Sequence, residues 1–579
     1  MLKSLTVKCY KAFGKGKQRQ TSILVGAAGK QTPLREPTLD DYEGETLEIR
    51  PITVLLGANS VGKTSLLDLL LALQQTNVYA AESSSSALKL NGRLVSLGEP
   101  GLLFHRGNMT EPMEIAFELD NSRRFGAYGE DFRKVLTETV QRIESLLRLA
   151  GKAFEGISPP DPGASSKGVL GGLRSVHLTL LENDPELFRL LALNDQYSEL
   201  LGRDHALSEL LVKSELTPGR RRPLYAAPDL LNSLKLIDAL HNAAANPTTT
   251  IRLLLTCEQS ILSIKKCSIL VGERNVISFG YGNKPGVPGN KCLVNLSSDL
   301  FDSSDLSSYE TSLGKMLRPD KPLFRLATSP DQERPGIYFT ELCWQIVRST
   351  LSELAESFSL EALAHIDADR GAPRRYYFSD FANEETGQKT GFVSVLAEDE
   401  NVRKAVSDWM ERFSLKLEVR QLADTVHRLL VEERGLSLGL DITDVGYGIS
   451  QVLPIIVKGL CAPPDSLTFI EQPEAHLHPK MQSELADLFL EMAGLASNRR
   501  NREPIKPPGG TIKRRFIIET HSEYLLKSSG CGLHRDWFSR MMWRSIFYLG
   551  LTRERLCFAG RRSQATATSS GQQSFMRPT

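Results

Sequence analysis

The first hundred residues contain three successive patterns of apolar positions. Residues 4–10 and 47–56 are continuously apolar or alternate with polar positions, which predicts two β-strands. A turn begins at Gly57, and after it leucines recur three or four positions apart, which predicts a helix. These leucines are Leu66, Leu67, Leu70 and Leu73. The second strand is therefore expected to lead through a turn directly into a helix.

Farther along the chain, the apolar spacing changes twice. Between residues 122 and 245 apolar side chains recur every three or four residues, with a Pro-, Gly- and Ser-rich stretch at 158–172 and no sustained heptads. Residues 250–295 contain short β-rich runs separated by turn residues, which predict antiparallel strands. A last stretch, 437–527, alternates strand-like and helical runs. We therefore expect an α/β protein with a large, mostly helical insertion and no long coiled coil.

Composition narrows the class of protein. The 579 residues are enough for two to four domains, and 41% hydrophobic with 24% charged residues excludes a wholly disordered chain. The eight cysteines form no C-x-x-C pair, and the N-terminus lacks the apolar core of a signal peptide. No apolar run approaches the ~20 residues that span a bilayer. We therefore expect a cytoplasmic protein with reduced thiols and no membrane partner.

The net charge of +1 hides an uneven distribution of charged residues. Residues 495–515 contain seven Lys or Arg against one acid, and residues 531–579 contain eight Arg against two acids. Local patches of this kind attract phosphate groups whatever the net charge of the chain. The balance excludes a uniformly basic nucleic-acid-binding protein, whereas binding of DNA or RNA at these two patches stays open.

A phosphate-binding motif follows the second predicted strand. Residues 57–64 read GANSVGKT and fit the pattern G-x-x-x-x-G-K-[ST], with the required strand before and helix after. In such a loop main-chain N–H groups surround a phosphate, the lysine reaches the terminal phosphates, and the threonine hydroxyl holds Mg²⁺. A glycine-rich turn that only caps a helix would need neither side chain. The predicted nucleotide-binding residues are Gly57, Asn59, Ser60, Gly62, Lys63, Thr64 and Ser65.

Such a loop needs a second strand that supplies an acidic magnesium ligand. Residues 467–470 have the character of a buried strand and end in Glu471, which is followed by Gln472 and Glu474. In isolation these carboxylates are equally well explained by a solvated turn, but beside a phosphate-binding loop they indicate metal binding and catalysis.

Two further segments complete the set of candidate residues. A strand-like run at 516–519 leads to His521, which alone would be an ordinary core or surface histidine. Residues 444–454 place Gly448 and Ser450 before an apolar helix, which is either a simple helix cap or a second anion-binding helix N-terminus. One chain has no use for two such sites on a single nucleotide. Two facing chains do, so we expect a homodimer or higher oligomer.

These motifs, in this order, resemble the ABC-type ATPase head of AAA-family proteins, which SMC and RecF proteins, OLD-family nucleases and ATPases of bacterial anti-phage systems such as Septu and retrons share. The resemblance covers residues 1–115 and 360–527. GANSVGKTS is similar to the Walker A motif, DVGYGISQVLP to the signature motif, LTFIEQPEAHLHP to the Walker B motif and D-loop, and ETHSE to the switch-histidine strand. IDADRGAPRRYY, at 366–377, resembles a segment of the defence-type ATPases. The resemblance implies a P-loop α/β fold, a mixed sheet flanked by helices, with ATP and Mg²⁺ as cofactors.

The resemblance also implies individual roles. Lys63 and Thr64 would bind phosphate and Mg²⁺, and Glu471 would be the Walker B acid and second magnesium ligand. Gly448 and Ser450 would reach the γ-phosphate bound by the partner chain. Gln472 stands where a water-activating glutamate is usual, a substitution that resembles other EQPE-type motifs. Because an amide cannot accept a proton, the resemblance implies either slow turnover or Glu474 as the general base.

His521 would sense or stabilise the γ-phosphate. An OLD-type nuclease would carry metal-binding acids, including a D-x-D set, after this histidine, but only Glu523, Asp536 and Glu554 follow it here. The D-x-D of Asp367–Asp369 lies before the Walker B strand and is expected to be a polar turn. We therefore expect no nuclease activity in this chain.

The implied function is an ATPase that dimerises through ATP, senses or clamps DNA or RNA, and regulates a separate effector such as a nuclease in anti-phage defence. A RecF-like ATPase of DNA repair or recombination is the first alternative. A nucleotide-dependent scaffold with little turnover is the second, and Gln472 favours it as much as the leading hypothesis.

Four segments are expected along the chain. Residues 1–115 would form the N-terminal half of the ATPase head, and residues 116–345 the insertion, with its β-rich part at 250–295. Residues 346–530 would form the C-terminal half, and residues 531–579 a basic tail.

The tail keeps no helical or strand pattern past Leu551. It is explained by a basic arm in which Trp537 and Trp543 stack on bases, by a plain disordered tail, or by a shifted reading frame that replaces the closing helix and strand. The eight arginines without a lysine favour the shifted frame.

Overall fold

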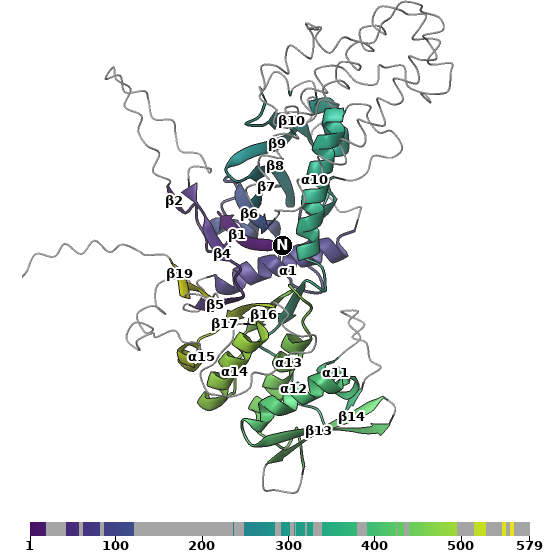
Figure 1. Cartoon of the computed structure of the whole chain (residues 1–579). Helices are drawn as coiled ribbons and strands as arrows, with labels where there is room; N and C mark the ends of the chain where they lie inside the picture. Colours follow the sequence, from purple (N-terminus) through teal and green to yellow (C-terminus); the bar gives the residue numbers. More distant parts are fainter. Residues whose placement is uncertain are drawn as a thin grey trace, which may run out of the picture. The chain divides into compact units, whose positions relative to one another are not determined.

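The computed structural model comprises two compact units, Met1–Ile49 with Ser65–Leu363 and Arg50–Thr64 with Ala364–Thr579 (Figure 1). It describes residues 1–18, 42–56, 62–81, 86–120, 236, 248–283, 291–301, 306, 309–318, 321–327, 338–378, 391–423, 425–433, 439–494, 514–528, 547–551 and 556–560. The predicted helical region of 122–245 lies outside these residues, apart from Leu236. No helix in the described ranges is long and apolar enough to cross a membrane.

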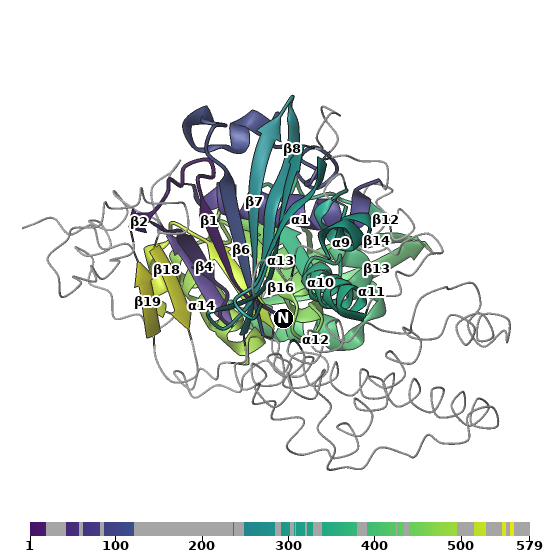
Figure 2. The same ribbon diagram turned by 90° about the horizontal axis from the view of Figure 1, so that it is seen from above.

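The first unit is built on a seven-stranded antiparallel sheet in the order β10-β9-β8-β7-β6-β1-β4 (Figure 1). Figure 2 labels β8, β7, β6, β1 and β4 of this sheet in a view from above. Its strands are β1 (Leu2–Lys8), β4 (Glu45–Glu48), β6 (Met113–Asp120), β7 (Thr248–Glu258), β8 (Ile261–Val271), β9 (Arg274–Asn283) and β10 (Lys291–Ser297). Side chains along β7 alternate between buried and partly exposed, as the sequence pattern predicts. Strands β7–β10 extend the sheet of β1 and β6, so segments on both sides of the expected boundary at residue 115 share one sheet.

Helices and short elements complete this unit. Helix α1 (Lys63–Tyr79) begins in the second unit and continues in the first. The remaining elements are α9 (Glu310–Met316), α10 (Tyr338–Ser357), the 3₁₀ segments η2 (Pro100–Leu103), η3 (His105–Gly107) and η4 (Leu323–Arg325), and the strand pair β2 (Lys17–Gln18) and β3 (Tyr42–Glu43). Phe358, which follows α10, packs edge-on against Phe117 of β6 with ring centroids 6.1 Å apart.

The second unit contains a six-stranded sheet in the order β11-β16-β17-β5-β18-β19. Its strands are β5 (Ile52–Leu56), β11 (Leu363–Ile366), β16 (Leu467–Glu471), β17 (Arg515–Glu519), β18 (Phe547–Leu551) and β19 (Leu556–Gly560). Strands β16, β17 and β5 are parallel neighbours, and their apolar runs are almost wholly buried, as strands covered on both faces require. Helices α13 (Tyr447–Cys461) and α14 (Pro479–Met492) supply side chains to the same hydrophobic core.

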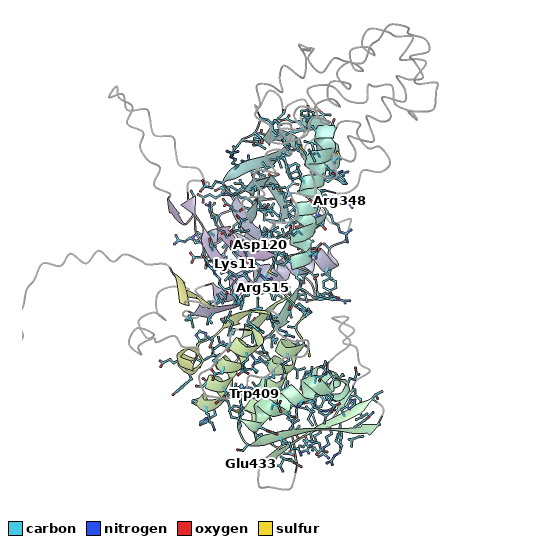
Figure 3. All side chains as sticks on the ribbon, viewed as in Figure 1. Lys11, Asp120, Arg348, Trp409, Glu433 and Arg515 are labelled. Atoms are coloured by element: carbon cyan, nitrogen blue, oxygen red, sulfur yellow. The ribbon has the colours of Figure 1, made fainter. Side chains whose placement is uncertain are left out.

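A smaller antiparallel sheet in the same unit has the order β12-β14-β13, with β15 paired to β14. Its strands are β12 (Tyr377–Phe378), β13 (Leu415–Ala423), β14 (Val426–Glu433) and β15 (Leu440–Asp441), and helices α11 (Phe392–Glu398) and α12 (Glu400–Glu411) belong to the same part. Asp399 caps α12 by accepting hydrogen bonds from two main-chain N–H groups of its first turn. Trp409, labelled in Figure 3, lies on α12 and is fully buried in the core that β16 and α13 share.

The described part of the tail contains two strands, and one of them, β19, lies past Leu551, where the sequence keeps no strand pattern. Strand β18 pairs antiparallel with β5, and β19 pairs antiparallel with β18. Strand pairing with an existing sheet edge supplies main-chain hydrogen bonds that a single-sequence pattern does not reveal. Trp537 and Trp543, the candidate stacking residues of the tail, lie outside the described residues.

Candidate nucleotide-binding site

The carboxyl ends of three parallel strands meet at one edge of the six-stranded sheet. Glu471, the last residue of β16, is in register with Glu519, the last residue of β17. Glu519 is in turn in register with Leu55 near the end of β5. Ligands of open α/β sheets bind at this edge of the strands. The sheet register therefore brings both acids beside the start of the predicted phosphate-binding loop.

Lys63 is the first residue of α1, and its ammonium group lies among these acids. Its Nζ is 3.7 Å from Glu519 Oε1, and the two residues are 3% and 6% exposed. Burial lowers the pKa of Lys63, and Glu519 partly offsets that effect. Burial raises the pKa of Glu519, which Lys63 opposes while Glu471 and Glu474 add to it. One buried lysine beside several acids leaves an excess of negative charge, which a metal ion bound there would offset.

The described part of the predicted loop begins at its last glycine. Gly62 has a φ of 106°, a conformation that favours glycine and allows the chain to turn into α1. Thr64 is exposed and Ser65 is partly buried on the first turn of that helix. Gly57, Asn59 and Ser60 lie outside the described residues.

Glu474 and His521 are linked directly. The main-chain N–H of His521 donates to Glu474 Oε1 at 2.7 Å. Burial lowers the pKa of His521, and the charge of Lys63 lowers it further while Glu474 opposes the change, a direction that favours the neutral ring. The predicted catalytic pair is therefore brought together at the ends of β16 and β17.

Three buried polar atoms of this cluster are available to a ligand. Glu474 Oε2, Glu519 Oε2 and His521 Nε2 have no hydrogen-bond partner among the residues that the structure describes. Buried polar atoms are otherwise nearly always paired, so such a group beside a lysine indicates a polar ligand site. A nucleotide phosphate with its magnesium ion and water fits this donor and acceptor set.

Two residues that the sequence analysis did not single out also belong to the site. Glu519 ends an apolar run just as Glu471 does, and that repeated strand-then-acid pattern was the signal that could have identified it. His365 Nε2 lies 2.9 Å from Glu471 Oε1, and its ring stacks on Phe469 at a centroid distance of 5.0 Å. His365 thus orients the carboxylate of Glu471, a contact that no spacing in the sequence predicts.

The predicted magnesium ligands are Thr64 and Glu471. In the part of the chain that the structure describes, no group of three or more His, Cys, Asp or Glu side chains could hold a metal ion. Mg²⁺ typically uses one or two protein ligands together with phosphate oxygens and water, and these two residues are of the kind it accepts.

Gln472 contacts the end of β17 through its main chain rather than through its side-chain amide. Its N–H donates to the carbonyl oxygen of Glu519 at 2.8 Å, and its φ is 40°. This bond ties the chain after β16 to the end of β17. The amide side chain remains unable to act as a base.

The signature segment packs against the loop that follows the Walker B strand. A Cβ placed on Gly448 would approach the carbonyl oxygen of His476 to less than 3.0 Å, so any other residue here would force the loop or the helix to move. Ser450 is 7% exposed and its hydroxyl donates to the carbonyl oxygen of Tyr447 at 2.7 Å. Its predicted contact with a partner's γ-phosphate stays a prediction and would require that hydroxyl to exchange its acceptor.

Two side chains of the predicted basic patch at 495–515 have a different role. Arg514 is buried and donates to the carbonyl oxygens of Ala462 and Leu460 at 2.7 and 2.9 Å. Arg515 donates to the carbonyl oxygen of Asp465 at 3.0 Å. The sequence count therefore overstated the charge available to a nucleic acid, because these arginines satisfy main-chain acceptors. The other basic residues of the patch lie outside the described residues.

Asp367 and Asp369 form the expected polar turn. Asp367 Oδ1 accepts the N–H of Asp369, and Asp369 Oδ1 accepts the N–H of Gly371, both at 3.0 Å. Both aspartates are exposed. This geometry is that of a local turn and provides no argument for a nuclease centre.

Two solved structures are similar to the chain at low scores. The SMC head domain from Thermotoga maritima is 8% identical, with 48% of this chain and 67% of that chain covered and a TM-score of 0.19. The Smc head domain with an extended coiled coil bound to the C-terminal domain of ScpA, from Pyrococcus furiosus, is 10% identical, with 91% of each chain covered and a TM-score of 0.26. No curated protein matches the chain.

The family match is extensive. A family model matches residues 52–244 and 334–527, which together exceed half of the chain and include Lys63, Glu471 and His521. The expected α/β ATPase fold, a mixed sheet flanked by helices, agrees with this match and with the observed sheet. The chain therefore belongs to the family described as "AAA domain, putative AbiEii toxin, Type IV TA system", a family of nucleotide-binding ATPases.

Proposed function

We propose that this chain binds ATP with Mg²⁺, dimerises through its ATP-bound heads, and hydrolyses ATP slowly to regulate a separate effector protein in anti-phage defence. The proposal rests on the buried cluster at the ends of β16 and β17. There Lys63 lies beside Glu519, and three polar side-chain atoms have no hydrogen-bond partner among the described residues. Most buried polar atoms in proteins are paired, so three unpaired atoms close to one lysine support a ligand site.

Each residue of the cluster would have a separate role in phosphoryl transfer. Lys63 would stabilise the terminal phosphates, and Thr64 with Glu471 would hold Mg²⁺, which neutralises phosphate charge when bound. Glu474 has one oxygen fixed by the N–H of His521, which leaves Oε2 to accept a proton from water. The neutral ring of His521 can donate to or accept from the reacting groups without adding charge.

Gln472 supports slow turnover, and the family's description supports a separate effector. Gln472 replaces the usual base, so the ATP-bound state is expected to persist, which suits a switch better than a motor. The resemblance to defence-type ATPases and the family's description as part of a toxin system support a partner protein, such as a nuclease, as the effector. DNA or RNA is the proposed trigger, and an adjacent nuclease or reverse-transcriptase gene would favour defence over a RecF-like role in repair.

Single-turnover hydrolysis with excess protein tests the proposed chemistry, since it measures slow rates. Glu474→Gln is expected to reduce the rate at least ~100-fold, because the amide cannot accept the proton. Glu418→Gln, at a partly exposed side chain of β13, is the matched control and should hydrolyse ATP at the wild-type rate.

Light scattering with MgATP tests dimerisation in the same samples. Glu474→Gln should accumulate as an ATP-bound dimer, whereas the wild type should return to monomer as ATP is consumed. A Glu474→Gln variant that turns over ATP at the wild-type rate would exclude Glu474 as the base. A wild type that stays monomeric at saturating MgATP would exclude dimerisation through ATP.

A further inference from the structure

The segment between β11 and β12, whose sequence resembles a segment of the defence-type ATPases, contacts the end of the Walker B strand β16. Arg370 lies on this segment, and its Nη2 donates to the main-chain carbonyl oxygen of Glu471 and, at 3.1 Å, to that of Gln472. One guanidinium nitrogen thus holds two successive carbonyl oxygens at the point where β16 ends. Because Glu474 follows three residues later, the same contact constrains the chain that carries the proposed base.

The rest of this guanidinium is buried among acids. Arg370 Nε and Nη1 have no hydrogen-bond partner in the described part of the chain. The acidic groups that act on it are Glu474, Asp367 and Glu471, while burial lowers its pKa. Burying the charge of an arginine costs free energy unless nearby acids balance it. Glu471 and Glu474 of the site supply that balance for Arg370.

The next residue ties the same segment to the start of α13. The carbonyl oxygen of Gly371 accepts a hydrogen bond from Gln451 Nε2 at 2.8 Å and from the Tyr447 hydroxyl at 3.4 Å. Arg375 forms two hydrogen bonds with Asp444, at 3.1 and 2.8 Å, just before that helix. Residues 370–375 therefore contact both the end of β16 and the signature segment.

We propose that Arg370 is a positioning residue for ATP hydrolysis, which holds the end of the Walker B strand and Glu474 in register with the signature helix. The inference rests on the proposed function, since it requires this site to hydrolyse ATP. Arg370 would therefore affect the rate of ATP hydrolysis and leave the affinity for ATP unchanged. A small displacement of a catalytic group can cost ~100-fold in rate, whereas binding by the phosphate loop is unaffected.

The test compares Arg370→Ala with wild type in single-turnover hydrolysis and in equilibrium ATP binding. We expect the rate of hydrolysis to fall ~10- to 100-fold while the dissociation constant for MgATP changes less than threefold. Added guanidinium at millimolar concentration should partly restore the rate of Arg370→Ala. Arg374→Ala, an exposed arginine of the same segment, is the control and should keep the wild-type rate.

Arg370→Lys provides the second variant, which retains the positive charge if the alanine variant does not fold. The lysine side chain is one bond shorter, so its ammonium does not extend as far as Arg370 Nη2, and we expect at least a tenfold slower rate for this variant as well. Hydrolysis within twofold of wild type in either folded variant would overturn the proposal. So would a loss of ATP affinity equal to the loss of rate, which would make Arg370 a binding residue. A wild type that does not bind ATP would instead overturn the proposed function itself.

Discussion

Replacement of Gly448 by alanine tests the close contact between the signature helix and the loop after the Walker B strand. The added Cβ would lie less than 3.0 Å from the carbonyl oxygen of His476 and 3.2 Å from both its carbonyl carbon and Leu477 Cδ2. Two of these three atoms belong to the main chain and cannot rotate away. The loop or the helix must therefore move.

The close contact and the helix propensity of alanine act in opposite directions on the free energy of unfolding of Gly448→Ala. Overpacking of this kind costs ~1–3 kcal/mol, and a fixed main-chain neighbour places Gly448→Ala in the upper part of that range. Alanine gains up to ~1 kcal/mol over glycine within a helix, which offsets part of the cost. We therefore expect a net loss of ~1–2 kcal/mol in the free energy of unfolding, or roughly 2–8 °C in Tm for a unit of this size.

Gly446→Ala is the matched control for Gly448→Ala. A Cβ on Gly446 meets nothing within 4 Å, and its φ of −56° is open to alanine. Alanine is only a poorer N-cap, so we expect a loss of ~0.5 kcal/mol. Chemical denaturation followed by circular dichroism measures both variants. Equal losses in the two, or a Gly448→Ala variant as stable as wild type, would refute the close contact.

Three further changes give defined outcomes in stability. Burial tends to raise the pKa of Asp441, but its hydrogen bonds with Arg428 and Thr443 together outweigh burial and lower the pKa below 3.8. The stability advantage of wild type over Asp441→Asn should therefore be complete above pH 3.8 and disappear as the pH falls through the lowered pKa. Burial raises the pKa of Glu519 above 4.5, so the advantage over Glu519→Gln should be largest below pH 4.5 and decline as the pH rises through the raised pKa. Urea titrations across this range measure both differences, and slopes of the same sign would contradict the assigned shifts. Trp409→Ala, at a side chain that is 0% exposed, should cost ~3–5 kcal/mol by the same assay, and a loss below ~1 kcal/mol would contradict its place in the core.

Sequence patterns predicted the strand–turn–helix around Lys63 and the acid after β16 because each depends on local spacing. The apolar runs of β5, β16 and β17 are continuous, which marks buried parallel strands. Glu474 and His521 were predicted separately, and the sheet register explains why they meet.

The parts that sequence reasoning missed depend on contacts between distant segments. Glu519 becomes a site residue only through its register with Glu471, and His365 only through pairing of β11 within the same sheet. Arg514 counts as surface charge in the sequence, whereas in the fold it donates to carbonyl oxygens. Strand β19 pairs antiparallel with the edge of β18, a contact that the local sequence pattern does not reveal.

Isothermal titration with MgATP tests most directly the central claim that the cluster at the strand ends is an ATP site. The wild type should bind ATP, and Lys63→Ala should bind at least ~100-fold more weakly, a loss of ~2.7 kcal/mol. Lys416→Ala, on the exposed face of β13, is the control and should bind as the wild type does. Equal affinity of wild type and a folded Lys63→Ala, or no binding by the wild type, would contradict the account.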